Sequence, residues 1–264
     1  MLNICWFSTG RDEEAFKLLV DVVHATKTKK IDGRISLCFF NRDPEESIYS
    51  QRMVEFAKTE GIPCEILSTR EFLFKKGLSL KEGRRLFDEE VLKIIENYRF
   101  DLIFLAGYML IVSEVLFDRF TILNLHPSLP GRHKGKWEDV IKKVIENGET
   151  TFGAMIHIVD GTLDGGPCVT FCKSEVSENE VLSLYEGAKR KEKEAFEKLF
   201  WLIREREFRL ETPLIIETLS LLSKGKIRIL GKKVYFEGKE IQGGIDITDL
   251  IVYGEGKEWR DSST

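Results

Sequence analysis

The sequence has no excess of positive charge, and this absence limits the partners it can have. Forty Lys and Arg residues stand against 44 Asp and Glu residues, which leaves a formal net charge of −4. A protein whose main partner is nucleic acid usually carries a basic surplus that neutralises phosphates. The composition therefore predicts no nucleic-acid partner and favours small-molecule substrates.

Long hydrophobic runs and disulfide-type cysteine patterns are also missing. No apolar stretch reaches the ~20 residues that cross a bilayer, and the first residues lack the pattern of a signal peptide. The five cysteines form no CxxC pair, so we interpret them as reduced core thiols. The four histidines are scattered without metal-ligand spacing. We therefore expect a cytoplasmic protein with no membrane partner and no metal site.

What is present is an alternation of short apolar runs with helix-period segments. Hydrophobic residues make up 42% of 264 residues, enough for one sizeable core. Apolar positions spaced by three and four residues predict helices between the runs. The alternation predicts an α/β fold, a Rossmann-like and mostly parallel sheet with helices on both faces. Its first strands are predicted over Leu2–Phe7, Ile35–Phe40, Cys64–Leu67, Leu102–Leu105 and Ile122–Asn124.

The remainder of the chain predicts a continuation of this domain and then an appendage. Thr212-Pro213 is the kind of pair that starts a helix. We therefore expect a catalytic domain over 1–207 and a C-terminal appendage of helix, hairpin and tail over 208–264. The predicted elements are strands at Thr151–Val159 and Pro167–Ser174, helices at Glu178–Arg206 and Leu214–Leu222, a hairpin of Ile227–Leu230 with Val234–Phe236, and a frayed tail from Glu255 to Thr264.

Asn124 and His126 stand two residues apart at the end of a predicted strand. In extended chain this spacing places both side chains on one face, and ligands of parallel sheets bind beyond the carboxyl ends of the strands. An amide and an imidazole aimed together can stabilise a carbonyl oxygen as it gains negative charge. The alternative is a turn asparagine beside a histidine that is hydrogen-bonded for structural reasons.

Asp164 lies in the glycine-rich loop Leu163-Asp164-Gly165-Gly166-Pro167. A carboxylate near His126 would favour the imidazolium ion and could relay a proton through water. A turn aspartate is the alternative. Of its neighbours, His157 is expected to be a core histidine with a hydrogen-bond partner, and Asp160 is expected to shape the loop.

Two further features are candidates for substrate binding. Gly10, Arg11 and Asp12 follow the first strand, where a helix N-terminus can receive an anion. The acidic residues there are equally favourable as first-turn residues in their own right and would repel phosphate. Glu192 falls on the apolar stripe of the predicted helix Glu178–Arg206, where it would need a partner such as a substrate amine, unless it extends to the surface.

Together these segments resemble the folate-dependent formyltransferases, and the resemblance runs from about Leu2 to Phe200. Two segments are highly specific for that family: Asn124-Leu125-His126-Pro127-Ser128, and His157-Ile158-Val159-Asp160 with Leu163-Asp164-Gly165-Gly166-Pro167. Supporting segments are Phe40-Asn41-Arg42-Asp43, Gly61-Ile62-Pro63 and Leu105-Ala106-Gly107-Tyr108-Met109.

The resemblance implies a function and a set of site residues. It implies transfer of a formyl group from 10-formyltetrahydrofolate to a primary amine, with glycinamide ribonucleotide of purine biosynthesis as the default acceptor. The catalytic residues would be Asn124, His126 and Asp164. The folate would be held by Met109, Leu110, Ile111, Val112, Val159 and Asp160, and the acceptor by Gly10, Arg11, Asp12 and Glu192.

The chain departs from the family pattern mainly where the acceptor would bind. Thr9-Gly10-Arg11-Asp12 replaces the family's phosphate loop of two glycines and a Ser-Asn pair, and Leu110 replaces an arginine. A sugar amine is therefore kept as an alternative acceptor, and hydrolysis of formyltetrahydrofolate as an alternative reaction. A transfer to methionyl-tRNA would need a basic C-terminal domain, and a folate-binding module without turnover is the non-catalytic alternative. A homodimer is left open.

Overall fold

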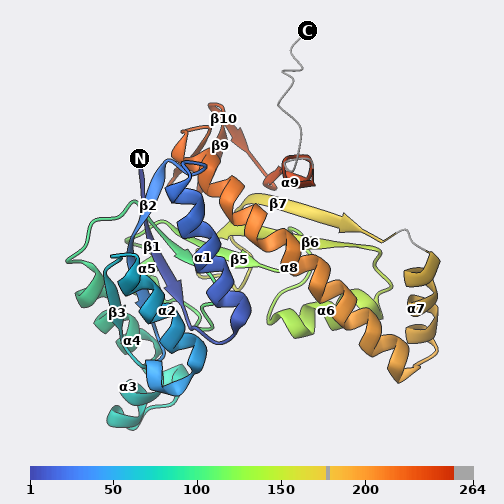
Figure 1. The fold of residues 1–264 in the computed structure, drawn as a ribbon, viewed down its shortest axis with the longest axis horizontal. Coiled ribbons are helices and arrows are strands. Elements are labelled where there is room, and N and C mark those ends of the chain that lie inside the picture. Colours follow the sequence, from blue (N-terminus) through green and yellow to red (C-terminus); the bar gives the residue numbers. More distant parts are fainter. Residues whose placement is uncertain (177–178, 253–264) are drawn as a thin grey trace.

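The computed structural model describes residues 1–176 and 179–252 (Figure 1). The strands are β1 (Leu2–Ser8), β2 (Gly33–Phe40), β3 (Cys64–Ile66), β4 (Leu102–Leu105), β5 (Ile122–His126), β6 (Thr151–Ile158), β7 (Cys168–Glu175), β8 (Ile227–Leu230), β9 (Lys233–Phe236), β10 (Lys239–Ile241) and β11 (Ile245–Asp246). The helices are α1 (Glu13–Lys27), the 3-10 helix η1 (Pro44–Glu46), α2 (Ile48–Thr59), α3 (Thr69–Lys76), α4 (Leu80–Ile95), α5 (Glu114–Phe117), α6 (Trp137–Glu146), α7 (Asn179–Lys189), α8 (Lys193–Ser223) and α9 (Thr248–Val252).

An eight-stranded sheet forms the centre of the molecule, in the order β11-β7-β6-β5-β4-β1-β2-β3. Strands β3, β2, β1, β4 and β5 pair in parallel, whereas β6 runs antiparallel to both β5 and β7. The predicted mostly parallel sheet is therefore confirmed. Because β1, β4 and β5 are parallel neighbours, their carboxyl ends meet at one edge of the sheet, where the site residues were expected.

The central strands are buried on both faces, which explains their continuous apolar runs. Side chains alternate along β1, so that Ile4 and Trp6 join the core on one face and Cys5 and Phe7 join the core on the other. Helices α1, α2 and α8 cover the first face, and α4 and α5 cover the second. Trp6 stacks on Phe104 of β4, with ring centroids 5.5 Å apart.

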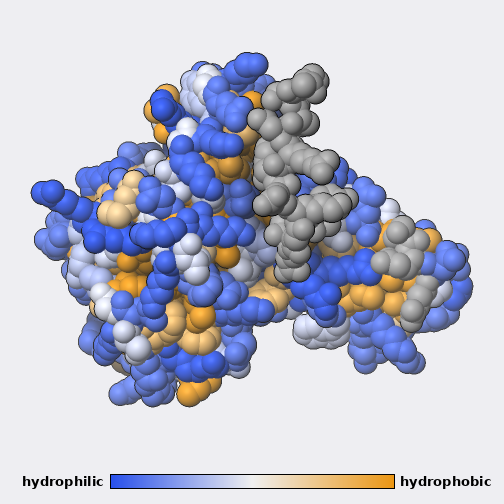
Figure 2. Space-filling model, turned by 45° about the horizontal axis from the view of Figure 1, so that its top comes forward, coloured by the Kyte–Doolittle hydropathy of each residue, from blue (hydrophilic) through white to orange (hydrophobic). Residues whose placement is uncertain are grey.

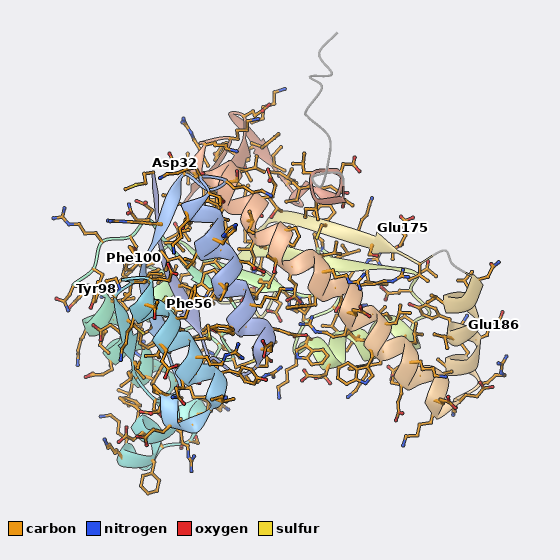
Figure 3. The ribbon with its side chains drawn as sticks, viewed as in Figure 1. Asp32, Phe56, Tyr98, Phe100, Glu175 and Glu186 are labelled. Atoms are coloured by element: carbon orange, nitrogen blue, oxygen red, sulfur yellow. The ribbon has the colours of Figure 1, made fainter. Side chains whose placement is uncertain are left out.

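The predicted helical faces are largely confirmed. Met53 and Ala57 of α2 are fully buried, as are Ile141 of α6 and Val91 of α4. Helix α4, to which Val91 belongs, ends at Ile95. Tyr98 lies in the loop beyond that end, near the outer edge of the sheet (Figure 3), and its hydroxyl donates a hydrogen bond to Glu65.

The single helix predicted over Glu178–Arg206 is wrong. Residue 178 lies outside the described residues, α7 ends at Lys189, and α8 begins at Lys193 with Glu192 as its N-cap. Lys191 adopts a left-handed conformation with φ of 62° between them. The apolar spacing continues across this break, so periodicity alone did not reveal it. Figure 1 shows α7 folded back beside the first turns of α8.

The helix start predicted at Thr212-Pro213 is also wrong, because α8 continues through Pro213 to Ser223. A proline inside a helix removes one backbone hydrogen bond and costs about 3 kcal/mol. Leu214, Ile215 and Leu219 are fully buried against the sheet. Burying three such side chains contributes roughly 1.5–3 kcal/mol each, which exceeds the cost of the proline. Tertiary packing thus overrides the local signal.

The C-terminal segment is joined to the main sheet. The predicted hairpin is confirmed as β8 and β9, to which β10 adds a third strand. The short strand β11 then pairs in parallel with β7 at the sheet edge, which the sequence did not predict. The boundary expected between 207 and 208 falls inside α8. The tail expected from Glu255 to Thr264 lies outside the described residues.

The surface agrees with the composition. Figure 2 shows a largely hydrophilic face on which hydrophobic residues gather in separate patches. Within the described residues, no helix has the length and apolarity needed to cross a membrane.

Candidate active site

One cavity of about 400 Å³ opens at the carboxyl ends of β1, β4 and β5. Its lining residues come from the loops after these strands, from the loop that follows β6, and from helices α1, α6 and α8. This volume lies within the range of small-molecule sites. Asn124, His126 and Asp164, here called the catalytic trio after the role that the sequence predicts for them, all line the cavity. The structure therefore brings together three residues that are up to 40 positions apart in the sequence.

Asn124 is held by His157 on the neighbouring antiparallel strand. The two residues face each other in the β5–β6 register, and the Asn124 Nδ2 atom lies 3.1 Å from His157 Nε2. Burial lowers the pKa of His157, so its ring is neutral near pH 7. With Nδ1 donating to the Ile158 carbonyl at 3.1 Å, Nε2 is the acceptor. One amide hydrogen of Asn124 is thus held by His157, and the second remains for a substrate.

His126 is oriented by the loop that follows β5. Its Nε2 donates to the carbonyl oxygen of His133 at 2.9 Å, and the side chain is 4% exposed. The backbone N–H of His133 in turn donates to Ser128 Oγ at 3.1 Å. With Nε2 engaged in this way, Nδ1 is the ring nitrogen that faces Asp164, with 3.7 Å between Nδ1 and Oδ2.

Asp164 lies between the two imidazole rings. Its Oδ2 accepts a hydrogen bond from the backbone N–H of Gly135 at 2.9 Å, and its Oδ1 lies 3.8 Å from His157 Nε2. The residue adopts φ of 45°, which a non-glycine residue rarely does. Strain of this kind is typical of functional positions, because the surrounding structure must hold it in place. The hydrogen bond from Gly135 and the unusual backbone conformation of Asp164 itself therefore hold the carboxylate beside His126.

An apolar wall, defined by Met109, Leu110, Ile111, Val112 and Val159, forms one side of the cavity, next to Leu163. Met109, Ile111 and Leu163 are 47%, 51% and 50% exposed, which is unusual for large apolar side chains. The backbone is fixed at both ends: Met109 N–H donates to Thr9 Oγ1 at 2.9 Å, and Arg84 donates to the Val112 carbonyl at 2.7 Å. The five residues predicted for the folate therefore lie together.

Asp160, the sixth residue predicted for the folate, does not line this cavity. Its Oδ1 accepts hydrogen bonds from the backbone and hydroxyl of Thr162 at 3.0 and 2.6 Å. These contacts form the turn that carries Leu163 and Asp164. The contacts of Asp160 thus agree with the prediction that it shapes the loop.

The charged part of the cavity lining, which we call the acidic end, begins beside the apolar wall, where Arg11 donates to Met109 Sδ at 3.8 Å. It consists of Arg11, Asp12, Glu14, Glu138, Arg204 and Glu211. Arg11 pairs with Asp12 at 3.1 Å and lies 3.9 Å from Glu138. Gly10, with φ of 60°, stands behind this surface against Ser50 and does not line the cavity. Of the three residues predicted in this loop to bind the acceptor, Arg11 and Asp12 therefore line the cavity.

Glu192, the fourth residue predicted for the acceptor, is outside the cavity. Its side chain is 52% exposed and pairs with Arg190 at 2.8 Å. The glutamate that α8 contributes to the cavity is Glu211, which is 5% exposed and accepts from Arg204 at 2.6 Å. Arg204 and Glu211 are seven residues apart, two helical turns on one buried face. A spacing of seven residues on one helix indicates such a pair. The pair was not predicted from the sequence, because one helix was expected to end at Arg206 and another to begin at Thr212-Pro213.

His133 and His157 complete the residues that the sequence did not mark as functional. His157 was predicted to be a core histidine with a hydrogen-bond partner, which is confirmed, but its partner is a member of the catalytic trio. His133 contacts His126 through its backbone carbonyl, and a pattern of side chains in the sequence cannot predict such a contact. In the described part of the chain, no group of three or more His, Cys, Asp or Glu side chains could hold a metal ion.

The Rossmann-like sheet and the catalytic trio at its carboxyl edge are those of a group-transfer enzyme. The family model described as "Formyl transferase" matches residues 13–199, so the chain belongs to the formyl transferase family. It is 29% identical over 157 residues to a phosphoribosylglycinamide formyltransferase of Escherichia coli, covering 59% of this chain and 66% of that protein. It is 30% identical over 177 residues to the enzyme of the same name from Dictyostelium discoideum, covering 63% of this chain and 80% of that protein.

A solved structure shares the fold. The phosphoribosylglycinamide formyltransferase of Coxiella burnetii superimposes with a TM-score of 0.70, covering 93% of this chain and 98% of that chain at 21% identity.

Proposed function

We propose that this protein transfers a formyl group from 10-formyltetrahydrofolate to a primary amine. The observation that carries the proposal is the convergence of the catalytic trio beside the apolar wall in one cavity. An amide donor, an imidazole and a carboxylate are what a carbonyl transfer needs to stabilise the developing oxyanion and to move a proton.

The apolar wall fits a flat heterocycle such as a pterin. Exposed Met109, Ile111 and Leu163 provide apolar surface for its faces. The backbone of Leu110 and Ile111 lies in neither a helix nor a strand, so its N–H and C=O groups can bond the polar edge of a ring. When bound, the folate supplies the formyl group.

The catalytic trio then has defined roles. Asn124 donates its second amide hydrogen to the formyl oxygen as that oxygen gains negative charge, and the His126 imidazole lies beside it. Asp164 accepts the proton that the amine loses when its nitrogen bonds to the formyl carbon. It returns that proton, through water, to the nitrogen whose bond to the formyl carbon breaks.

The names of the relatives make glycinamide ribonucleotide the acceptor to assay first. Glu211 supports an amine on the α8 side of the cavity, the role that the resemblance had placed on Glu192. We also propose a cytoplasmic location, which the five free cysteines support. Sedimentation equilibrium would distinguish a monomer from a homodimer.

The test is an assay with 10-formyltetrahydrofolate and a panel of amines, with formate release measured in parallel. Transfer to an amine, lost by ~10²–10³-fold in kcat in Asn124→Ala, supports the proposal. Formate release without any formylated amine would make the protein a formyltetrahydrofolate hydrolase instead. Folate binding without either product would leave a binding module and refute catalysis.

A further inference from the structure

The acidic end of the cavity is where an acceptor would lie once the apolar wall holds the folate. Figure 1 shows α1 and α8 running side by side, and residues from both helices reach this end. The cavity as a whole is lined by five carboxylates, Asp12, Glu14, Glu138, Asp164 and Glu211, against the three cations Arg11, Lys136 and Arg204. The balance of charge therefore disfavours an anion.

The N-terminus of α1 is already occupied by a carboxylate. Asp12 is the N-cap, and its Oδ1 accepts a hydrogen bond from the Ala15 N–H at 3.0 Å. Glu13 and Glu14 follow in the first turn. A helix N-terminus attracts phosphate through free N–H groups and its positive dipole end. Here the side chain of Asp12 accepts from one of these N–H groups, and the acidic first turn complements the positive dipole end.

The two arginines of the acidic end are engaged as well. Arg204 is 6% exposed and donates to Glu211 at 2.6 Å and to Glu14, while its buried Nε has no hydrogen-bond partner among the described residues. Arg11 donates to Asp12 and lies near Glu138. The remaining cation, Lys136, is exposed to solvent and forms the N-cap of α6. A phosphate at the acidic end would therefore compete with carboxylates that already pair with both guanidinium groups, and displacing one of them would leave a buried or partly buried carboxylate unpaired.

The carboxylates themselves call for hydrogen-bond donors. Glu138 Oε2 is buried and has no hydrogen-bond partner among the described residues. Glu211 is only 5% exposed and is one of the residues that line the cavity. Ammonium and hydroxyl groups donate to such oxygens, whereas a phosphate dianion cannot.

We infer that the acceptor is an amine that presents ammonium or hydroxyl donors, and no phosphate, to the acidic end. This inference rests on the proposed formyl transfer and names the class of its substrate. Amino sugars and other hydroxyl-bearing amines belong to that class. Glycinamide riboside is then a better acceptor than glycinamide ribonucleotide, from which it differs only by the phosphate.

The test compares kcat/KM for these two acceptors and their affinities by calorimetry. The expected result is at least a tenfold preference for the riboside in both measurements. In the double variant Asp12→Asn and Glu138→Gln, two negative charges are removed while an amide retains the cap, and the preference should fall at least threefold. In the control Glu13→Gln, the changed side chain is 62% exposed, pairs with Arg52 and does not line the cavity, and the preference should not change.

Equal use of the two acceptors, a preference for the ribonucleotide, or binding of neither one would overturn the inference. These outcomes are separate from failure of the proposed function. If the ribonucleotide is formylated well, the transferase proposal stands and the inference fails. If neither acceptor is formylated but the riboside binds tenfold more tightly, the inference stands and the transfer proposal fails for this pair.

Discussion

Glu207 offers a stringent test of how α8 is packed. It lies on the buried face of the helix between Arg204 and Glu211, with no exposed surface, and neither of its carboxylate oxygens has a hydrogen-bond partner among the described residues. Burial raises the pKa of Glu207 well above its usual value, and the nearby Glu211 raises it further. Folding therefore favours the protonated form of this side chain.

The sign of the pH dependence follows from this shift. A carboxyl group whose folded-state pKa is raised contributes its stability fully below the unfolded pKa, ~4.3. That contribution is lost as pH rises towards the folded pKa. Across this window the unfolding free energy should fall by about 1.4 kcal/mol per pH unit because of this one group. Glu207→Gln removes the titration, so the variant should gain on the wild type as pH rises.

The measurement is denaturant unfolding of wild type and Glu207→Gln at pH values from 5 to the alkaline limit of reversibility, with m-values compared at each pH. Glu205→Gln is the matched control, because that side chain lies on the same helix, is 64% exposed and forms a surface pair with Arg209. Its effect should stay within ~0.5 kcal/mol at all pH values. Parallel pH profiles for wild type and Glu207→Gln would refute the burial argument.

Three further predictions concern the cavity and the thiols. Asn124→Ala should lower kcat by ~10²–10³-fold with folate affinity nearly unchanged, measured by steady-state kinetics and folate titration, because an oxyanion donor acts only in the transition state; an equal loss of folate affinity would contradict this role. His157→Phe should lower kcat through Asn124, so the double variant should be little worse than Asn124→Ala alone; additive losses would show that His157 acts independently. Cys168 and Cys172, whose pKa burial raises to about 12, should react with a thiol reagent only on unfolding; rapid labelling of the native protein would show that β7 opens.

Most of the fold was readable from local patterns. The strands β1, β2, β4 and β5 are short apolar runs buried on both faces, and this burial makes their composition distinctive. The errors fall where packing overrides a local signal. Lys191, which follows the end of α7, adopts a left-handed conformation that is unusual for a lysine and that the sequence therefore did not predict. Pro213 remains inside α8 because the residues after it are buried.

The candidate site divides in the same way. Asn124 and His126 were readable because two residues on one strand end share a face. Asp164 was readable through its glycine-rich loop and the family resemblance. Glu211 and Arg204 were missed, because their relation to the cavity depends on how α8 lies against α1. The spacing of residues within α8 does not predict which other parts of the chain this helix will pack against.

The sequence by itself determined the chemistry of this protein: an amide, an imidazole and a carboxylate at strand ends, in segments specific enough to indicate formyl transfer. Only the tertiary structure decided what surrounds them. It placed His157 against Asn124 and the His133 carbonyl against His126, and it put Glu211, and not Glu192, in the cavity lining. The physical reason is that side-chain periodicity reports only burial within one element, whereas a cavity is formed by elements that meet from distant parts of the chain.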